Sequence, residues 1–353
     1  MQIKRLLAVM LIAGSTTLGL TACDPPMPPD VAAQLAEEYY TCVEGESTVS
    51  SDLLMNDVVL GWADSLSFSC IDPEPTMTFS VLDQSDTSVA AQISASAATC
   101  SPLETFPIGV DASVLVFTQS ELGAISLSPK SIAGILEGSI TNWNELADDN
   151  PGYDMPDMPI QLIPEADKVA LDAMRSFLAQ SDITLSDSLL VEEVVSPEVD
   201  LYSALPEGYF ALVPNSYASY LGLTPASIYL GFNEEFQEAI VANADLPGIQ
   251  SATTQWKYSE SDSGLTVTLD PNTEPTPPEG SDTIDNPYQA IYPLNFNMCS
   301  TDELITRAIG RFMLRLDSQG ALGGSYFVPL PEAIRIAALV RISKGLPTPA
   351  PTE

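Results

Sequence analysis

Histidine is absent from this 353-residue chain. Its absence excludes a Ser-His-Asp triad, a histidine general base and a histidine-ligated zinc ion. No nucleophile paired with a base is recognisable among the remaining residues. The sequence therefore predicts a protein that is not an enzyme and that has no resident metal and no cofactor.

Basic residues are scarce. The chain has 12 Lys and Arg against 48 Asp and Glu, which gives a formal net charge of −36 at pH 7. A surface this acidic repels nucleic acid and anionic lipid headgroups, so no nucleic-acid partner is expected. Because 45% of the residues are hydrophobic, the chain can still bury a sizeable core.

No apolar run in the sequence is long enough to cross a membrane. Near the start, Lys4 and Arg5 precede the apolar residues 6–12, and Leu20-Thr-Ala-Cys23 is typical of a lipobox. We interpret residues 1–22 as a lipoprotein signal peptide and Cys23 as the residue that carries the acyl chains, such as palmitate. An ordinary secretory signal that ends near a cysteine is the alternative. The mature protein is expected outside the cytoplasm, anchored to the cell membrane by lipid on Cys23.

Four further cysteines, Cys42, Cys70, Cys100 and Cys299, remain in the mature chain. An even number in an exported protein predicts two disulfides, for which three pairings are possible. We prefer Cys42–Cys70, which joins the neighbours of the first strand. The other pair, Cys100–Cys299, would then tie the segment before a buried strand to the returning C-terminal part.

Predicted strands and helices alternate along the chain, which indicates an α/β fold with mostly parallel strands. The apolar runs at residues 113–118 and 208–213 predict buried strands. Ser128 followed by Pro129 predicts the start of a helix, and helical spacing predicts further helices at residues 52–66, 169–180 and 332–343.

Other segments carry weaker patterns. Residues 23–35 predict a proline-rich tether, and residues 346–353 a disordered tail. Residues 89–94 are expected to form a short helix, and residues 301–316 a helix with its arginines on the outer face. The acidic, proline-rich residues 259–286 are expected to form an exposed excursion.

Several short sequence motifs, called words below, are similar to those of a known family. Ile140-Thr-Asn-Trp-Asn144 follows a capped helix, and Asn150-Pro-Gly leads to Pro159-Ile160. Trp62-Ala-Asp-Ser65 precedes these words, and Tyr326-Phe-Val-Pro-Leu-Pro331 follows them. Their order resembles the solute-binding protein of the bacterial phosphate-specific ABC transporter.

The resemblance implies a type II periplasmic-binding fold, in which two lobes joined by two crossing strands enclose a ligand cleft. Lobe 1 would comprise residues 36–112 and 218–345, and lobe 2 residues 113–217. The resemblance also implies a monomer that binds a small solute, such as a phosphate-like anion, and that serves an ABC permease.

Carried over residue by residue, the resemblance implies a degenerate phosphate site. The candidate ligand-binding residues are Ser47, Thr48, Ser85, Thr87, Ser88, Asp167 and Lys168. The glycines of the family's second loop are absent, and residues 94–100 lack the family's aspartate. Glu165 stands where an arginine is expected.

Two alternatives remain open for this chemistry. The carboxylates of Glu46, Asp86, Glu165 and Asp167 could instead ligate Ca²⁺ or Mg²⁺. The other hypothesis is that the protein is a surface protein with a degenerate cleft, which keeps the fold to bind a partner and takes no part in transport. Binding of a small ligand by the purified protein separates that reading from a solute-binding protein.

Overall fold

The computed structural model describes residues 42–71, 74, 76–83, 86, 88–185, 189–193, 206–278, 283–299 and 304–346. The predicted signal peptide, the predicted lipidation site Cys23, the predicted tether and residues 347–353 of the predicted tail lie outside this part. The described residues all belong to one compact unit. Within the described part, no helix is both long and apolar enough to cross a membrane.

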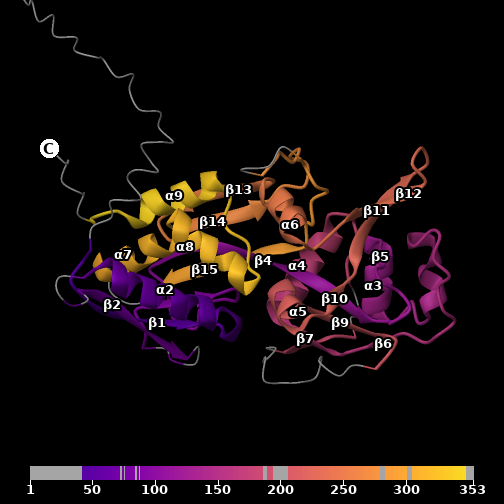
Figure 1. Ribbon diagram of the computed structural model, residues 1–353, viewed down its shortest axis with the longest axis horizontal. Coiled ribbons are helices and arrows are strands. Elements are labelled where there is room, and N and C mark those ends of the chain that lie inside the picture. The colour runs from indigo at the N-terminus through magenta and orange to yellow at the C-terminus, as the bar shows by residue number, and fades with distance from the viewer. Residues whose placement is uncertain are drawn as a thin grey trace, which may run out of the picture. The chain divides into compact units, whose positions relative to one another are not determined.

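A large mixed sheet organises the described chain (Figure 1). Its main path runs β13-β14-β4-β15-β3-β1-β2. β1 pairs in parallel with β2 and with β3, whereas β15 runs antiparallel to β3 and β4. These strands are β1 (Gly45–Ser51), β2 (Met77–Asp83), β3 (Ala91–Ser94), β4 (Glu104–Thr118), β13 (Trp256–Ser261), β14 (Gly264–Leu269) and β15 (Ile291–Met298).

β4 is the strand that both halves of the sheet share. It has 15 residues, and all but its ends are buried. Its first part pairs with β15 as far as Ala112, and its second part pairs with β9 (Tyr209–Pro214) from Ser113 onward. The buried strands predicted at residues 113–118 and 208–213 are therefore confirmed, but β4 begins nine residues earlier than the apolar run suggested.

The second set of strands gathers around β9 and the end of β4. β6 (Gln161–Leu162) pairs with β9, and β10 (Thr224–Pro225) pairs with β4. β11 (Ser227–Asn233) joins β12 (Glu238–Ala242) and β5 (Ser126–Leu127), while β7 (Glu165–Asp167) pairs with β8 (Val191–Glu193). β10 and β11 thus pair with β4 and β5, and β12 pairs with β11, although the sequence-based scheme gave residues 224–242 to lobe 1.

Helices connect and cover these strands. Around the first set lie α2 (Asn56–Ser69), α6 (Leu246–Thr253), α7 (Leu304–Met313), α8 (Leu316–Gly320) and α9 (Glu332–Ile342), with the 3₁₀ turns η1 (Leu53–Met55) and η3 (Ala321–Ser325). Around the second set lie α3 (Pro129–Glu137), η2 (Trp143–Asp149), α4 (Lys168–Ala179) and α5 (Asn215–Leu221).

The predicted start of α3 is confirmed. Ser128 is its N-cap and accepts a hydrogen bond from Ser131 N at 3.2 Å, and Pro129 occupies the first turn. The helix ends at Gly138, whose φ of 73° lies in the left-handed region that favours glycine.

The residues of the Ile140-Thr-Asn-Trp-Asn144 word have structural roles. Asn142 and Glu145 form a capping box at the start of η2. The fully buried Trp143 stacks on Phe210 of β9 with ring centroids 4.7 Å apart. This word therefore fixes a turn against the sheet and does not contribute to a ligand site.

Three local predictions are wrong. Residues 91–94 form strand β3 and not a helix, because they pair with β1 and β15. Arg307 does not face solvent: its side chain is only 6% exposed and its Nη2 lies 3.3 Å from Glu104 Oε1. Residues 259–261 and 264–269 belong to the β13–β14 hairpin and not to an exposed excursion.

Both predicted disulfides are present, with the preferred pairing. Cys42 is bonded to Cys70, and Cys100 is bonded to Cys299, 199 residues away. The second bond joins the segment before β4 to the end of β15, two strands that are already hydrogen-bonded neighbours.

We predict that the Cys100→Ser/Cys299→Ser double variant folds but loses about 2–5 kcal/mol of unfolding free energy, because the long loop no longer restricts the unfolded chain. Urea denaturation monitored by tryptophan fluorescence measures the change. An unfolding free energy within about 0.5 kcal/mol of wild type would contradict it.

Candidate functional site

A cavity of about 240 Å³ lies where the start of η1, the start of α4, and strands β4 and β15 meet. Three aspartates from three different elements line it: Asp52, Asp111 and Asp167. We call it the carboxylate pocket. Its remaining lining residues are Leu53, Leu54, Met55, Ala95, Ser96, Lys168, Val169, Pro214, Tyr292, Leu294 and Phe327.

Asp52 holds two segments together at one side of the pocket. It is the residue before η1, and its Oδ2 accepts a hydrogen bond from Ala95 N at 2.9 Å, just after β3. Burial raises the pKa of Asp52 to about 6; the Ala95 N–H opposes the shift and the charge of Asp167 adds to it. Asp52 therefore binds a proton more readily than an exposed aspartate.

Asp111 lines the pocket from β4, two residues before that strand begins to pair with β9, and is 2% exposed. Its Oδ1 accepts from Ala112 N at 2.7 Å and from Ser216 N at 3.1 Å. Its Oδ2 accepts from Ser216 Oγ at 2.6 Å and from the Tyr292 hydroxyl at 3.2 Å. Burial raises the pKa of Asp111 to about 7, although these four donors favour the charged form.

Asp167 and Lys168 form the third side. Asp167 is the N-cap of α4 and accepts from Ala170 N at 2.9 Å, and burial raises its pKa. Lys168 Nζ lies 3.0 Å from Asp172 Oδ2 on the same helix, and its side chain is 56% exposed. The positive charge nearest the pocket is therefore partly neutralised and strongly solvated.

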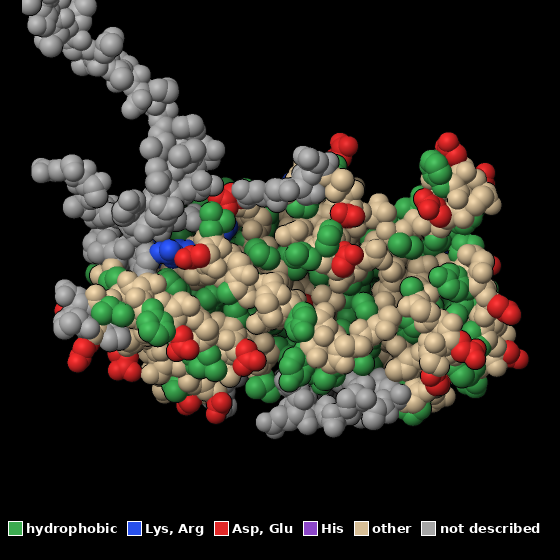
Figure 2. All heavy atoms as spheres, in the orientation of Figure 1, with side chains coloured by type: hydrophobic (Ala, Val, Ile, Leu, Met, Phe, Trp, Pro, Cys, Tyr) green, Lys and Arg blue, Asp and Glu red, His purple; other side chains and the backbone are tan. Residues whose placement is uncertain are grey.

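The electrostatics of the pocket are dominated by these carboxylates. Burial raises the pKa of Tyr292 well above 10, and the charges of Asp111, Asp167 and Asp52 add to the shift. The N–H groups of Ala95 and Ala170 are already bonded to the chain's own carboxylates. Such groups serve as anion ligands when they are available, so the pocket offers a dianion few donors and much repulsion. Figure 2 shows that acidic side chains are also spread over the visible face of the molecule.

Only some of the predicted site residues meet here. Asp167 and Lys168 line the pocket. Ser47 and Thr48 lie within β1, where Ser47 Oγ contacts Thr306 Oγ1 at 3.4 Å and Thr48 Oγ1 accepts from Ala90 N at 3.1 Å, and neither lines the pocket. Ser88 is exposed and lies outside the lining.

Other candidates are not gathered at the pocket. Ser85 and Thr87 lie outside the described residues. Of the four carboxylates considered for a divalent cation, only Asp167 lines the pocket, and Glu46 instead accepts from Ser80 Oγ at 3.1 Å. Across the described part of the chain, no three acidic, cysteine or histidine side chains are grouped so that they could hold a metal ion.

Sequence reasoning missed Asp52, Asp111 and Tyr292. Asp111 could have been noticed, because it is the single charged residue among residues 106–117, which are apolar apart from it and Ser113. Asp52 opens the predicted helix at residues 52–66, but an N-cap was the ordinary interpretation. Tyr292 lies on β15, and nothing in the sequence indicates its hydrogen bond to Asp111.

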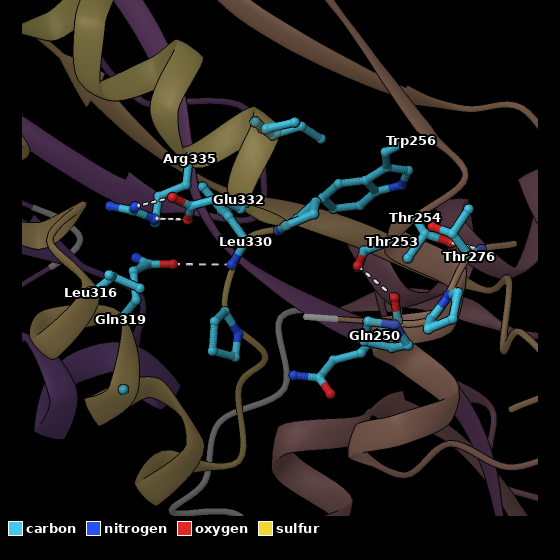
Figure 3. Close-up of a pocket in the computed structure, with 17 residues that line it drawn as sticks. Gln250, Thr253, Thr254, Trp256, Thr276, Leu316, Gln319, Leu330, Glu332 and Arg335 are labelled. Atoms are coloured by element: carbon cyan, nitrogen blue, oxygen red, sulfur yellow. Dashed lines mark hydrogen bonds and ion pairs between the residues drawn. The ribbon is translucent and has the colours of Figure 1, made fainter. Parts of the chain in front are cut away.

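Two further cavities are present. One of about 490 Å³ shares Leu53 and Leu54 with the carboxylate pocket and is lined by the exposed Tyr220 and Tyr326. The other, of about 600 Å³, lies between α6, β13 and the starts of α8 and α9, and contains none of the predicted site residues. Figure 3 shows its Glu332–Arg335 ion pair and the hydrogen bond from Leu330 N to Gln319 at 3.0 Å.

Comparison with solved structures identifies the fold. A phosphate ABC transporter substrate-binding protein from Clostridium perfringens, with bound phosphate, covers 81% of this chain and all of its own at 12% identity and a TM-score of 0.50. A high-affinity periplasmic phosphate-binding protein bound with phosphate covers 87% of this chain and all of its own at 12% identity and a TM-score of 0.55.

A human phosphate-binding apolipoprotein covers 84% of this chain and 94% of its own at 13% identity and a TM-score of 0.56. The chain has the fold of phosphate-binding proteins. The predicted α/β, two-lobed periplasmic-binding fold is thereby confirmed. These neighbours are binding proteins and not enzymes. No family model matches the chain, and no curated protein is similar to it in sequence.

We predict that the unfolding free energy falls as the pH rises from about 4 to about 7. The folded chain binds more protons than the unfolded chain in this window, because the pKa values of Asp52 and Asp111 are raised to about 6 and about 7 from 3.8. Asp52→Asn should remove up to roughly 3 kcal/mol of this change, mainly between about pH 4 and 6. Urea denaturation across the range measures it, and a flat or rising wild-type profile would contradict it.

Proposed function

We propose that this chain is a lipid-anchored, extracytoplasmic solute-binding protein that takes a small solute into the carboxylate pocket. The observation that carries the proposal is the position of the pocket. It lies at the shared strand β4, between the start of η1 on one set of elements and the start of α4 on the other. The two-lobed fold supports the same conclusion. The lipobox at residues 20–23 supports the anchor.

The chemistry of the pocket favours a solute that brings hydrogen-bond donors or positive charge. Three carboxylates, of which Asp111 is buried and Asp52 and Asp167 are half-buried, surround about 240 Å³. Among the described residues that line the pocket, the cation is Lys168, which is paired with Asp172. Two like charges about 5 Å apart repel each other by roughly 3 kcal/mol at an effective dielectric constant of about 20. A phosphate dianion would meet this repulsion several times, whereas an ammonium or polyhydroxylated solute would not.

The size of the site suits a small solute. The neighbouring cavity with Tyr220 and Tyr326 shares two lining residues with the pocket and adds about 490 Å³. Together they fall within the range of ordinary small-molecule sites, and the two tyrosines offer apolar rings with polar tips at the exposed end. Delivery of the solute to an ABC permease by a monomeric chain, without catalysis, completes the proposal.

A calorimetric screen of the purified protein tests the solute-binding role. It compares small amines, polyols, amino acids, phosphate, sulfate and divalent cations. Binding of any one of them, lost in Asp52→Asn and Asp167→Asn but kept in the exposed-site control Asp86→Asn, supports the proposal. If no solute binds, the fold serves partner binding and the proposal is wrong.

We predict that phosphate binds this chain at least about a hundredfold more weakly than it binds a protein of the phosphate-transporter family. In that family an arginine and a Ser-Gly-Thr run stand where this chain has Glu165 and Val169-Ala-Leu171. Each missing charge-assisted hydrogen bond is worth roughly 1.5–3 kcal/mol, and at least two are missing. Residual phosphate binding should weaken further in Lys168→Ala and stay unchanged in Lys257→Ala, whose lysine pairs with Asp270 away from the pocket. Submicromolar phosphate affinity that stays the same in Lys168→Ala would contradict this prediction.

We predict that Cys23→Ala releases the protein from membranes or leaves the precursor uncut, because the acyl chains would have no thiol to attach to. Fractionation of expressing cells followed by mass spectrometry of the N-terminus measures this. Membrane retention of a correctly cleaved variant would show that the anchor is elsewhere.

A further inference from the structure

The hydrogen-bond partners of Asp111 divide between its two oxygens. Oδ1 contacts only backbone N–H groups, Ala112 N and Ser216 N, which can donate but never accept. Oδ2 contacts only hydroxyls, Ser216 Oγ and the Tyr292 hydroxyl, which can do either. A proton can therefore sit on Oδ2 and be donated to one of these hydroxyls, while all four contacts stay in place.

These contacts join three elements at one point. Asp111 belongs to β4 just before that strand exchanges β15 for β9, Tyr292 belongs to β15, and Ser216 lies at the start of α5. Asp111 and Tyr292 line the carboxylate pocket, and Ser216 lines the neighbouring cavity. The Asp111 carboxyl group thus lies at the part of β4 that a solute in the pocket would contact.

We propose that Asp111 is a proton-holding clasp: it keeps β4, β15 and α5 joined in both protonation states, and its proton sets the charge that the pocket presents to a solute. The inference rests on the proposed solute-binding function and adds its regulation. Asp111 is a positioning residue for the three elements and a charge switch for the pocket. Near neutrality, an anion binds with proton uptake by the site, and a cation binds with proton release.

Other charged or titratable groups line the pocket together with Asp111. They are Asp52 before η1, Asp167 and Lys168 at α4, and Tyr292 on β15; α5 contributes the neutral Ser216. The negative charges of Asp52 and Asp167 favour protonation of the other carboxylates in the pocket, and the positive charge of Lys168 disfavours it. Burial raises the pKa of Asp111 to about 7, which brings its charge change to ordinary solution conditions.

The first experiment needs no solute. Carbon-13 NMR of aspartate-labelled full mature chain follows the side-chain carboxyl signals from about pH 4 to about pH 9. One signal should titrate near neutrality, disappear in Asp111→Asn and remain in Asp149→Asn, a buried aspartate outside the pocket that accepts from Ser128 N at 2.6 Å. Its midpoint should rise in Ser216→Ala and in Tyr292→Phe, because each variant removes a donor to the charged form. Absence of such a signal in wild type overturns the proposal.

The second experiment uses sulfate and methylammonium, neither of which changes its own charge between about pH 5.5 and about pH 8.5. By calorimetry, sulfate should bind at least about tenfold more weakly at the higher pH, and methylammonium at least about tenfold more tightly. Asp111→Asn should reduce both dependences, and Asp149→Asn should keep them. Binding that is indifferent to pH, or no binding of either probe, overturns the coupling. If the whole solute screen fails while the NMR titration is intact, the proposed function is wrong and the clasp stands.

Discussion

The shared strand β4 is the constraint on which the rest of the structure depends. Its fifteen residues are buried almost throughout, and it is hydrogen-bonded first to β15 and then to β9. The exchange of partners between Ala112 and Ser113 joins the two sets of strands through one continuous strand. A carboxylate buried there needs hydrogen-bond donors, because an unsatisfied buried carboxylate is costly. The four donors around Asp111 meet this requirement.

The carboxylate pocket results from the way in which the ends of helices and strands near β4 are hydrogen-bonded. A backbone N–H at the start of a turn or helix requires an acceptor, and here aspartates of the chain itself provide it: Asp52 for Ala95 N and Asp167 for Ala170 N. An anion would compete with these internal acceptors. The same local geometry that can hold an anion elsewhere therefore becomes an acidic pocket when the capping residue is a carboxylate.

The positions of the few basic residues add to the negative charge of the pocket and the surface. Arg307, Arg335 and Arg341 have side chains that are 6%, 1% and 9% exposed. They pair with Glu104 and Glu332 in the interior around α7 and α9. With these cations used for internal ion pairs, little positive charge is left to offset acidic groups at the surface or in the pocket.

Features that depend on short-range chemistry could be predicted from the residues alone. Periodicity and capping residues located α2, α3, α4 and α9, and apolar runs located the buried cores of β4 and β9. The family motifs led to the fold, the even cysteine count led to two disulfides, and the positions of the predicted strands led to their preferred pairing. These features can be predicted from the sequence because capping residues, turns and buried apolar segments are each set by a few neighbouring residues. The lobe boundaries at residues 112/113 and 217/218 stay a prediction.

Only the tertiary structure decided which side chains meet. Residues 91–94 became a strand because β1 and β15 flank them, and Arg307 turned inward because Glu104, 203 residues away, needed a partner. Asp52, Asp111 and Asp167 are 59 and 56 residues apart in the chain, yet line one cavity. Their raised pKa values come from burial that no local pattern reports, since burial depends on the packing of elements distant in sequence.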